Sequence, residues 1–512
     1  MKLSELVGML EITEAPAPGL LPDREVLDIA HDSRKVKPGS LFVAVRGFHS
    51  DGHQFISQAV ERGAVAVVAE QRAPAAGSPQ VLVRDSRRAL AILADAFYGH
   101  PSQRLSLVGV TGTNGKTTTT YLVKSIIEAS GATAGLIGTI DYRVGDRVYP
   151  APNTTPESLD LQRLLAEMVG LGASACVMEV SSHALELGRT AGCAFVVAAF
   201  TNLTQDHLDF HETMDAYFRA KLRLFTGLSA KGSAVVNLDD PRAPEIAKAT
   251  AAKVITTGMS SSADVHPAGA IEHGIRGLGF TATSPAGPVR IDSPLVGRHN
   301  IYNILTAIGI ASGLGMSSET ITRGIGNMKA VPGRMEKVDE GQPFGVVVDY
   351  AHTEDALVRL LDAVREIAAK RVITVFGCGG DRDRTKRPKM GAAAIKGSDV
   401  TIVTSDNPRT EDPSAIIGEV EQGMAEAVKM PLSEGAAASA SGRKPYYVIP
   451  DRHEAIARAI RMAEPGDVVV LAGKGHEDYQ IIGSAKLHFD DREVAREEIR
   501  RYNAECGMRS AE

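Results

Sequence analysis

A short glycine-rich turn carries the residue types that bind phosphate. Leu105–Val110 is an apolar run of the length of a buried strand, and Gly112–Gly115 predicts a turn. Lys116 and Thr117 then open a predicted helix. The N–H groups of such a turn face an anion, Lys116 adds a positive charge, and the Thr117 hydroxyl can bind Mg²⁺. Because Val110 stands where a glycine is usual, G-T-N-G-K-T-T is a shortened phosphate loop; the alternative is an ordinary glycine turn.

Three further residues in the same region can do chemistry. Glu179 ends a predicted buried strand, where an acidic side chain can hold Mg²⁺; a helix cap or salt bridge is the alternative. His207 lies in a loop between two nearby aspartates, and a structural histidine is the alternative. Lys221 lies on a predicted helix, Met214–Phe225, and its spacing alone indicates a solvated lysine.

Charged residues of both signs gather in loops of the last third of the chain. Arg382 and Arg409 suit capture of a carboxylate or phosphate, while Asp406 and Glu477 suit an ammonium group. A site of both signs suits a zwitterion such as an amino acid. The run Arg382–Lys389 could instead be a nucleic-acid patch, but the acidic chain and the aspartates within and beside it argue against this.

The elements that position these residues alternate between strand and helix. This predicts an α/β fold in three domains: a small α/β domain over 1–104, a central phosphate-loop domain with a mostly parallel sheet over 105–333, and a Rossmann-like α/β domain over 334–512. Ala330–Arg334 is the predicted linker, and 330–336 the predicted hinge. In such sheets ligands bind beyond the carboxyl ends of the strands.

The predicted element bounds follow the apolar runs. Strands are expected at 41–45, 64–69, 80–83, 134–138, 176–179, 196–200, 234–237, 345–350, 371–376, 400–404, 446–449 and 467–471, helices at 87–98 and 299–313, a β excursion within 258–296, and a surface loop at 434–444. The turns 31–34 and 47–52 are rich in hydrogen-bonding groups, and they are either functional or simply capped by their own Asp and Ser side chains.

Composition narrows the class of protein. The 512 residues carry a formal net charge of -6, which supports neither a nucleic-acid nor a membrane-surface role. The four cysteines are scattered and form no C-x-x-C pair, which indicates free thiols in a reducing compartment. The acidic N-terminal region has no signal-peptide pattern, and no apolar run approaches the length of a spanning helix. We therefore expect a cytoplasmic enzyme.

Ten segments in order resemble the Mur ligase family. The resemblance runs from about His31 to Asp491. The segments that carry it are GTNGKTT (112–118), NTTPE (153–157), MEVSSHAL (178–185), TNLTQDHLDFH (201–211), GRHNIYN (297–303), PGRME (332–336), DYAH (349–352), GCGGDRDRTKRP (377–388), SDNPR (405–409) and AGKGHEDYQ (472–480).

The resemblance implies an ATP-dependent amide ligation in peptidoglycan precursor synthesis. It implies that meso-2,6-diaminopimelate is joined through an acyl phosphate to the D-glutamate side-chain carboxylate of UDP-N-acetylmuramoyl-L-alanyl-D-glutamate. The partners would be these small molecules, with no nucleic acid or membrane, and the chain a monomer. Two Mg²⁺ ions are expected, with CO₂ bound as a carbamate on Lys221, which replaces the solvated-lysine interpretation.

The family positions assign roles residue by residue. The matches to the catalytic positions are Lys116, Glu179, His207 and Lys221, and those to the magnesium positions are Thr117, Glu179, His207 and Lys221. The matches to the ATP positions are Gly112, Thr113, Asn114, Gly115, Lys116, Thr117, Thr118, Asn300, Arg334 and Asp349. The matches to the UDP-muramoyl-peptide positions are Ser33, His49, Ser50, Asn153, Thr154, Thr155, Ser181 and Arg189, and those to the diaminopimelate positions are Arg382, Asp406, Asn407, Pro408, Arg409, Gly473 and Glu477.

Two positions depart from the family pattern, and three alternatives remain. Glu354 follows Thr353 where the family usually has proline, and Leu187 stands where some relatives have a polar substrate contact.

We expect Arg409 to favour diaminopimelate over lysine, because it can pair with the second carboxylate. The alternatives are a lysine-adding Mur ligase, a folylpolyglutamate synthase, and a nucleotide-gated scaffold built on an inactive ligase.

Overall fold

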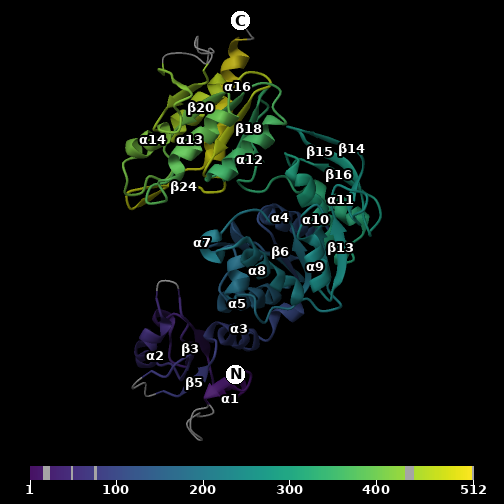
Figure 1. Cartoon of the computed structure of the whole chain (residues 1–512), viewed down its shortest axis with the longest axis vertical. Coiled ribbons are helices and arrows are strands. Elements are labelled where there is room, and N and C mark those ends of the chain that lie inside the picture. Colours follow the sequence, from purple (N-terminus) through teal and green to yellow (C-terminus); the bar gives the residue numbers. More distant parts are fainter. Residues whose placement is uncertain (15–23, 48–49, 74–77, 433–442, 510–512) are drawn as a thin grey trace. The chain divides into compact units, whose positions relative to one another are not determined.

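The computed structural model describes residues 1–14, 24–47, 50–73, 78–432 and 443–509. The chain forms two compact units (Figure 1). The first unit comprises Met1–Pro267, Ala282–Val289 and Tyr302–Gly324, and the second comprises Ala268–Thr281, Arg290–Ile301 and Ile325–Glu512. Sheets in both units are mostly parallel and carry helices on both faces, so the predicted α/β class is confirmed.

The N-terminal sheet has the order β1-β5-β4-β3-β2. Its side chains alternate between two cores, as the period of a strand requires. Leu41 and Val43 pack with α1 and α3, whereas Phe42 and Ala44 pack with α2. The elements are α1 Leu3–Val7, β1 Ile12–Glu14, β2 Asp28–Ala30, η1 Ser33–Lys35, β3 Ser40–Val43, η2 Gly52–Phe55, α2 Ile56–Glu61, β4 Ala66–Ala69, β5 Gln80–Val83, α3 Ser86–Phe97 and η3 Pro101–Arg104.

The central sheet has the order β13-β12-β11-β6-β10-β7-β8-β9 and is parallel from β13 to β7. Because β6 lies between β10 and β11, the carboxyl ends of these three strands meet at one edge. The strands are β6 Ser106–Thr111, β7 Ala134–Ile137, β8 Asp141–Val144, β9 Arg147–Pro150, β10 Ala175–Glu179, β11 Phe195–Phe200, β12 Ser233–Asn237 and β13 Lys253–Thr257. This arrangement positions the phosphate turn.

Helices cover both faces of the central sheet. Met178 and Phe200 pack against α5 and α8 on one face, while α4 packs on β7 and β10. The helices are α4 Lys116–Ala129, α5 Ser158–Gly170, α6 Ser182–Glu186, α7 Leu208–His211, α8 Met214–Thr226, α9 Ala243–Ala249, α10 His299–Gly313 and α11 Ser318–Asn327. The predicted β excursion is confirmed as a three-stranded sheet of β14 His266–Gly274, β15 Gly277–Thr283 and β16 Val289–Ser293.

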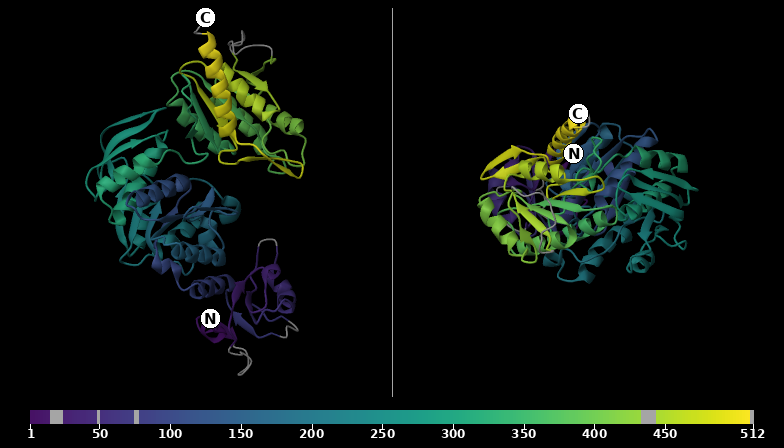
Figure 2. Two further views of the ribbon diagram at one scale, coloured as in Figure 1. Left: turned by 180° about the vertical axis from the view of Figure 1, so that it is seen from behind. Right: turned by 90° about the horizontal axis from the view of Figure 1, so that it is seen from above.

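The C-terminal sheet has the order β17-β18-β23-β19-β20-β22-β21, parallel except for β17. Helices α12, α13 and α14 pack on one face, and α15 and α16 on the other. Figure 2 shows the yellow helix α16 in front of this sheet when it is seen from behind. The elements are β17 Glu336–Lys337, β18 Gly345–Asp349, α12 Glu354–Arg365, β19 Val372–Phe376, α13 Lys386–Gly397, β20 Val400–Val403, α14 Pro413–Glu421, β21 Val428–Lys429, β22 Pro445–Val448, α15 Arg452–Met462, β23 Val468–Ala472, β24 Tyr479–Ile482, β25 Ala485–His488 and α16 Asp491–Arg509.

Most predicted strands fall within one or two residues of the observed ones. The predicted helix at 299–313 is observed as α10 with the same bounds. The sequence did not predict several short or exposed strands, because they lack the continuous apolar run of a buried strand. These strands are β1, β2, β8, β9, β13, β17, β21, β24 and β25. Most of the expected loop at 434–444 lies outside the described residues.

Candidate active site

The phosphate turn is held open by its glycines. Gly112 has φ +145° and Gly115 φ +87°, a region that favours glycine. A β-carbon at either position would clash, at Gly112 with Thr201 Oγ1 and at Gly115 with Asn303 Oδ1. Thr201 Oγ1 donates to Asn114 O at 2.6 Å, so the loop after β11 fixes the turn. The first turn of helix α4 follows directly, beginning at Lys116 and burying Thr117 and Thr118.

Two lysines converge on one carbonyl of this turn. Lys116 Nζ donates to Gly112 O at 3.1 Å, and Lys221 Nζ donates to the same oxygen at 2.8 Å. Lys221 is only 2% exposed, so the solvated-lysine interpretation is wrong: α8 packs this side chain under the turn. Burial, and then the charge of Lys116, hold the pKa of Lys221 well below its usual range. A neutral amine is the form that reacts with CO₂.

Glu179 ends β10 beside the turn and is 1% exposed. Its Oε1 accepts from Thr139 N at 2.8 Å and its Oε2 from Thr139 Oγ1 at 3.1 Å. A β-carbon at Gly138 would lie 2.6 Å from Oε1, so the backbone must approach closely here. A carboxylate has about four acceptor positions, which leaves Glu179 able to bind a further partner.

His207 belongs to a group of aromatic side chains near Lys221. It has φ +52°, its Nε2 lies 3.4 Å from Asp206 Oδ2, and its ring centroid lies 4.7 Å from that of His183. Burial, and to a lesser degree Lys116 and Lys221, lowers the pKa of His207, while Asp206 opposes the shift. The imidazole is therefore biased toward the neutral form that binds metal.

The predicted muramoyl-peptide residues gather around the end of β10. Thr155 Oγ1 donates to Glu179 O at 2.9 Å and accepts from Ser181 N at 3.1 Å. Arg189 donates to Thr155 O at 3.0 Å and pairs with Glu157 at 2.9 Å. The structure thus brings three predicted substrate residues to the strand that carries Glu179.

Asn153 and Thr154 directly precede Thr155 in the chain. Thr154 Oγ1 lies 3.1 Å from Thr139 Oγ1, the hydroxyl that holds Glu179. The Asn153 carbonyl accepts from Tyr142 OH at 2.5 Å. Leu187, the departure from the family pattern, is the C-cap of α6 and is half-buried.

The two polar turns of the N-terminal region are capped as the simpler interpretation expected. Asp32 accepts from Arg34 N, and Asp51 accepts from His53 N.

Two of the three predicted uridine-nucleotide residues lie within the described chain. Ser33 is buried and its Oγ donates to Gln58 Oε1 at 2.7 Å. The exposed Ser50 closes its turn by accepting from Gly47 N at 2.8 Å. His49 lies outside the described residues.

The remaining predicted ATP residues belong to the second unit. Asn300 Nδ2 donates to a backbone carbonyl at 2.7 Å. Asp349 accepts two backbone hydrogen bonds at 2.8 Å, and burial raises its pKa. The Arg334 guanidinium lies 5.3 Å from the Tyr350 ring centroid. Gly333 has φ +64° and a β-carbon there would clash with the backbone of Gly475, so the predicted hinge packs against the loop that follows β23.

The predicted diaminopimelate residues meet at the carboxyl ends of β19, β20 and β23. Arg409 Nη1 donates to Gly380 O at 2.8 Å, and its backbone N donates to Ile481 O at 3.0 Å. A β-carbon on Gly380 would clash with Pro408 O, so the two loops approach backbone to backbone. Arg382 Nη1 donates to a neighbouring carbonyl at 3.3 Å.

A buried lysine joins the acidic residues of this site. Lys474 is 0% exposed, and its Nζ lies 3.2 Å from Asp406 Oδ1 and 3.8 Å from Glu477 Oε2. Asn407 Nδ2 donates to Glu477 Oε2 at 2.9 Å. Gly473 has φ +114°, a backbone conformation that favours glycine. The sequence pattern did not single out Lys474, although it stands within the quoted AGKGHE segment.

A buried arginine braces the neighbouring loops. Arg387, 0% exposed, contacts both oxygens of Glu411 at 2.8 and 2.9 Å and Glu419 at 2.8 Å. It also donates to Gly379 O at 3.2 Å. Glu411 in turn accepts from Asp381 N at 2.6 Å. Spacing offered no signal for this role, because an arginine between lysine and proline resembles a surface residue.

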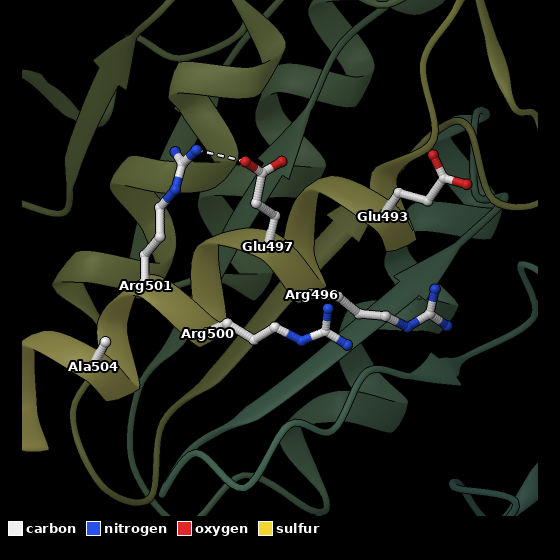
Figure 3. Close-up of a pocket in the computed structure, with 6 residues that line it drawn as sticks. All are labelled: Glu493, Arg496, Glu497, Arg500, Arg501 and Ala504. Carbon is white, nitrogen blue, oxygen red and sulfur yellow. Dashed lines mark hydrogen bonds and ion pairs between the residues drawn. The ribbon is translucent and has the colours of Figure 1, made fainter.

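A surface depression on α16 is separate from these loops. Figure 3 shows its charged side chains, with Arg501 paired to Glu497 at 2.5 Å. Its lining residues are Glu493, Arg496, Glu497, Arg500, Arg501 and Ala504, none of them a predicted ligand residue.

Within residues 1–14, 24–47, 50–73, 78–432 and 443–509, no three His, Cys, Asp or Glu side chains gather as a metal site. The expected magnesium ligands include a threonine and a carbamate and therefore form a set of a different kind. In the same part of the chain no helix has the length and apolar character to cross a membrane.

These features define a phosphate-loop α/β protein. The first unit has a shortened phosphate turn on a parallel sheet, with a buried lysine beneath the turn. The second unit has a Rossmann-like sheet whose strands end in charged loops. Family models match three consecutive segments: "Mur ligase family, catalytic domain" at 26–98, "Mur ligase middle domain" at 110–311 and "Mur ligase, glutamate ligase domain" at 333–475. The chain belongs to the Mur ligase family, and the expected three-domain fold is confirmed.

Curated relatives align over nearly the full length. A protein of Geobacillus thermodenitrificans is 49% identical over 98% of this chain and 99% of its own. One of Geobacter metallireducens is 49% identical over 96% and 97%. Both are named UDP-N-acetylmuramoyl-L-alanyl-D-glutamate–2,6-diaminopimelate ligase. A solved structure of the same name is 33% identical, with a TM-score of 0.71 over 98% of this chain and 99% of that one.

Proposed function

We propose that this chain is an ATP-dependent ligase that joins meso-2,6-diaminopimelate to the D-glutamate side chain of UDP-N-acetylmuramoyl-L-alanyl-D-glutamate. The observation that carries the proposal is the phosphate turn with Lys116 and Lys221 on one carbonyl, in a chain 49% identical over 98% of its length to a protein named for this reaction. We expect a cytoplasmic monomer whose partners are these small molecules.

The reaction needs an activated acid, because an oxide leaving group makes a carboxylate a poor acyl donor. A D-glutamate carboxylate oxygen attacks the γ-phosphorus of ATP, the bond to the β-phosphate oxygen breaks, and ADP leaves. The neutral amine of diaminopimelate then attacks the acyl phosphate. Inorganic phosphate leaves, a proton is released, and the amide remains.

The residues of the first unit suit the first step. Lys116 and the N–H groups of the turn would bind the phosphates, and their positive charge offsets the charge that develops during transfer. Thr155, Ser181 and Arg189 would orient the acid beside Glu179. Holding the reactants in register supplies much of the rate, since it removes the entropy cost of bringing them together.

Thr117, Glu179, His207 and a carbamylated Lys221 would hold magnesium. Oxygen donors are the ligands that this ion prefers, and Glu179 keeps acceptor positions beyond those that Thr139 uses. When bound, Mg²⁺ would offset negative charge on the phosphoryl oxygens. The depressed pKa of Lys221 supports the carbamate, because its free amine can add CO₂ with loss of a proton.

The choice between diaminopimelate and lysine is assigned to Arg409. Diaminopimelate has a second carboxylate that this guanidinium can pair with, and lysine has none. An arginine left unpaired in the site would reject lysine by roughly 2 kcal/mol or more. The test is phosphate release with UDP-muramoyl dipeptide, ATP and each amino acid. Equal kcat/KM for the two amino acids would contradict this assignment.

The other candidates give different results in the same assay. Release with lysine alone would indicate the lysine-adding ligase, and release with a folate and glutamate would indicate folylpolyglutamate synthase. The segment that matches at 26–98 and the D-N-P-R loop argue against the latter. No release with all three substrates would favour an inactive scaffold.

A further inference from the structure

We propose that Lys474 is a positioning residue that keeps Asp406 and Glu477 both ionised, so that together they bind one ammonium group of the amino-acid substrate. The inference rests on the proposed function and adds to it the charge of the amino-acid site. Lys474 itself would not touch the substrate, because it is 0% exposed beneath the two carboxylates.

The contacts of Lys474 point inward to the acidic pair. Its Nζ lies 3.2 Å from Asp406 Oδ1, 3.4 Å from Asn407 Oδ1 and 3.8 Å from Glu477 Oε2. The two carboxylates are 9% and 18% exposed, so they lie between the lysine and the loop surface. A ligand that approaches from that surface would meet carboxylate oxygens before it could meet the lysine.

Charge explains why a lysine is needed here. Two carboxylates that share a buried site repel each other, and one of them then takes up a proton. Burial, and next the charge of Asp406, raise the pKa of Glu477, while Lys474 opposes the rise. With Lys474 present, two negative charges and one positive charge leave a net charge of −1. One ammonium group neutralises that charge.

The neighbouring cation, Arg452, makes its direct contacts with other residues. Arg452, also 0% exposed, pairs with Asp491 at 2.6 Å and donates to Ala472 O at 3.0 Å. Tyr350 and Tyr479 face Glu477 as well, and burial raises the pKa of both phenols. Arg409 and Arg382 lie on the adjacent loops and suit the substrate carboxylates. Among the described residues, Lys474 is therefore the cation that forms ion pairs with both Asp406 and Glu477.

Asn407 connects Lys474 and Glu477 to Ile481, whose carbonyl also accepts a hydrogen bond from the Arg409 backbone. Its Oδ1 accepts from Ile481 N at 2.9 Å as well as from Lys474, and its Nδ2 donates to Glu477 at 2.9 Å. These partners fix which end of the amide faces the glutamate. Loss of the lysine would loosen this orientation as well as change the charge.

The test is the pH dependence of kcat/KM for diaminopimelate in wild type and Lys474→Met, measured by phosphate release. Methionine keeps an unbranched side chain of similar length without the charge. At neutral pH we expect the KM for diaminopimelate to rise about tenfold or more, with the KM values for ATP and UDP-muramoyl dipeptide unchanged. The acidic limb should move to higher pH, and the KM ratio to wild type should fall as pH rises, because the carboxyl that gained a proton loses it again.

Lys370→Met is the matched control, since it removes one positive charge from an exposed site in the same unit. It should leave every KM and the acidic limb unchanged. A KM ratio for Lys474→Met that does not vary with pH would overturn the inference, because a merely structural role predicts it. If Lys474→Met does not fold, Lys474→Arg decides: the charge is kept, so the limb should stay in place, and a shifted limb overturns the inference. Absence of wild-type activity would overturn the proposed function instead.

Discussion

The phosphate turn and the loops proposed to bind the amino acid (377–387, 405–411 and 473–477, here the amino-acid loops) both lie at the carboxyl ends of parallel strands, yet they are held in different ways. The phosphate turn depends on backbone: Gly112 and Gly115 have positive φ, and a β-carbon at either would clash. The amino-acid loops depend on side chains, with Lys474 and Arg387 buried among carboxylates. A site built from backbone is formed by consecutive residues, whereas a side-chain network is formed by residues that lie far apart in the chain.

The largest effect is expected at the residue that links the turn to α8. Lys221→Ala removes the buried amine and, with it, the proposed carbamate. We expect kcat to fall by roughly 100-fold or more, since the loss falls on groups that face developing charge. High bicarbonate should not restore activity. The measurement is phosphate release with all three substrates.

Lys231→Ala, an exposed lysine that follows α8, is the control and should be fully active. A Lys221→Ala variant with near wild-type turnover would mean that the phosphate turn works without the carbamate. The turn would then depend on its backbone and on Lys116 alone.

The difference between the two sites also decides what the sequence could predict. The turn, the place of Glu179 at the end of a strand and the positions of most strands followed from glycine spacing and apolar runs, and α10 was predicted to the residue. Spacing alone gave the wrong environment for Lys221, because position on a helix does not say which face of α8 is buried. The family resemblance gave this lysine a functional role, and its burial supports that role. Lys474 and Arg387 were missed, because their partners lie up to 68 residues away in the sequence.

A second prediction breaks the side-chain network of the amino-acid loops. Arg387→Met leaves Glu411 and Glu419 without their buried partner and frees the Gly379 carbonyl. We expect the second unit to lose about 1–3 kcal/mol of stability and the KM for diaminopimelate to rise several-fold, with the KM for ATP unchanged. Thermal unfolding and phosphate release measure the two effects.

Arg384→Met is the matched control, because Arg384 pairs with the same Glu419 but is 65% exposed. Exposed pairs contribute little, so this variant should resemble wild type. Equal losses in the two variants would show that the charge of Glu419, rather than the buried brace, matters.

The ion pair between Arg387 and Glu411 should make the stability of the fold depend on pH. Arg387 lowers the pKa of Glu411 from 4.5 to about 2. A carboxyl group whose pKa is lowered by folding stabilises the fold at pH values above its unfolded pKa. This stabilisation is lost as the pH falls through the folded pKa. The stability advantage of wild type over Glu411→Gln should therefore be full above about pH 4.5 and shrink toward about pH 2. An advantage that does not change across this window in thermal unfolding would contradict the assigned pKa.

The smallest effect is expected at the helix start next to the amino-acid loops. Glu354 is the first residue of α12, where the family usually has proline. Proline suits this position, since its missing N–H has no helical partner there. Thr353 has φ −123° and ψ 160°, the extended conformation that a residue before proline adopts. Its side chain accepts from Ala356 N and caps the helix with either residue.

Glu354→Pro should therefore change stability by no more than about 0.5 kcal/mol, because a favourable charge at the helix N-terminus is exchanged for a more restricted unfolded chain. Phosphate release should equal that of wild type. Arg359→Pro, in the interior of the same helix, is the contrast and should cost about 3 kcal/mol. A loss of activity in Glu354→Pro without a loss of stability would place this helix start in the amino-acid site, which the side-chain network described above does not require.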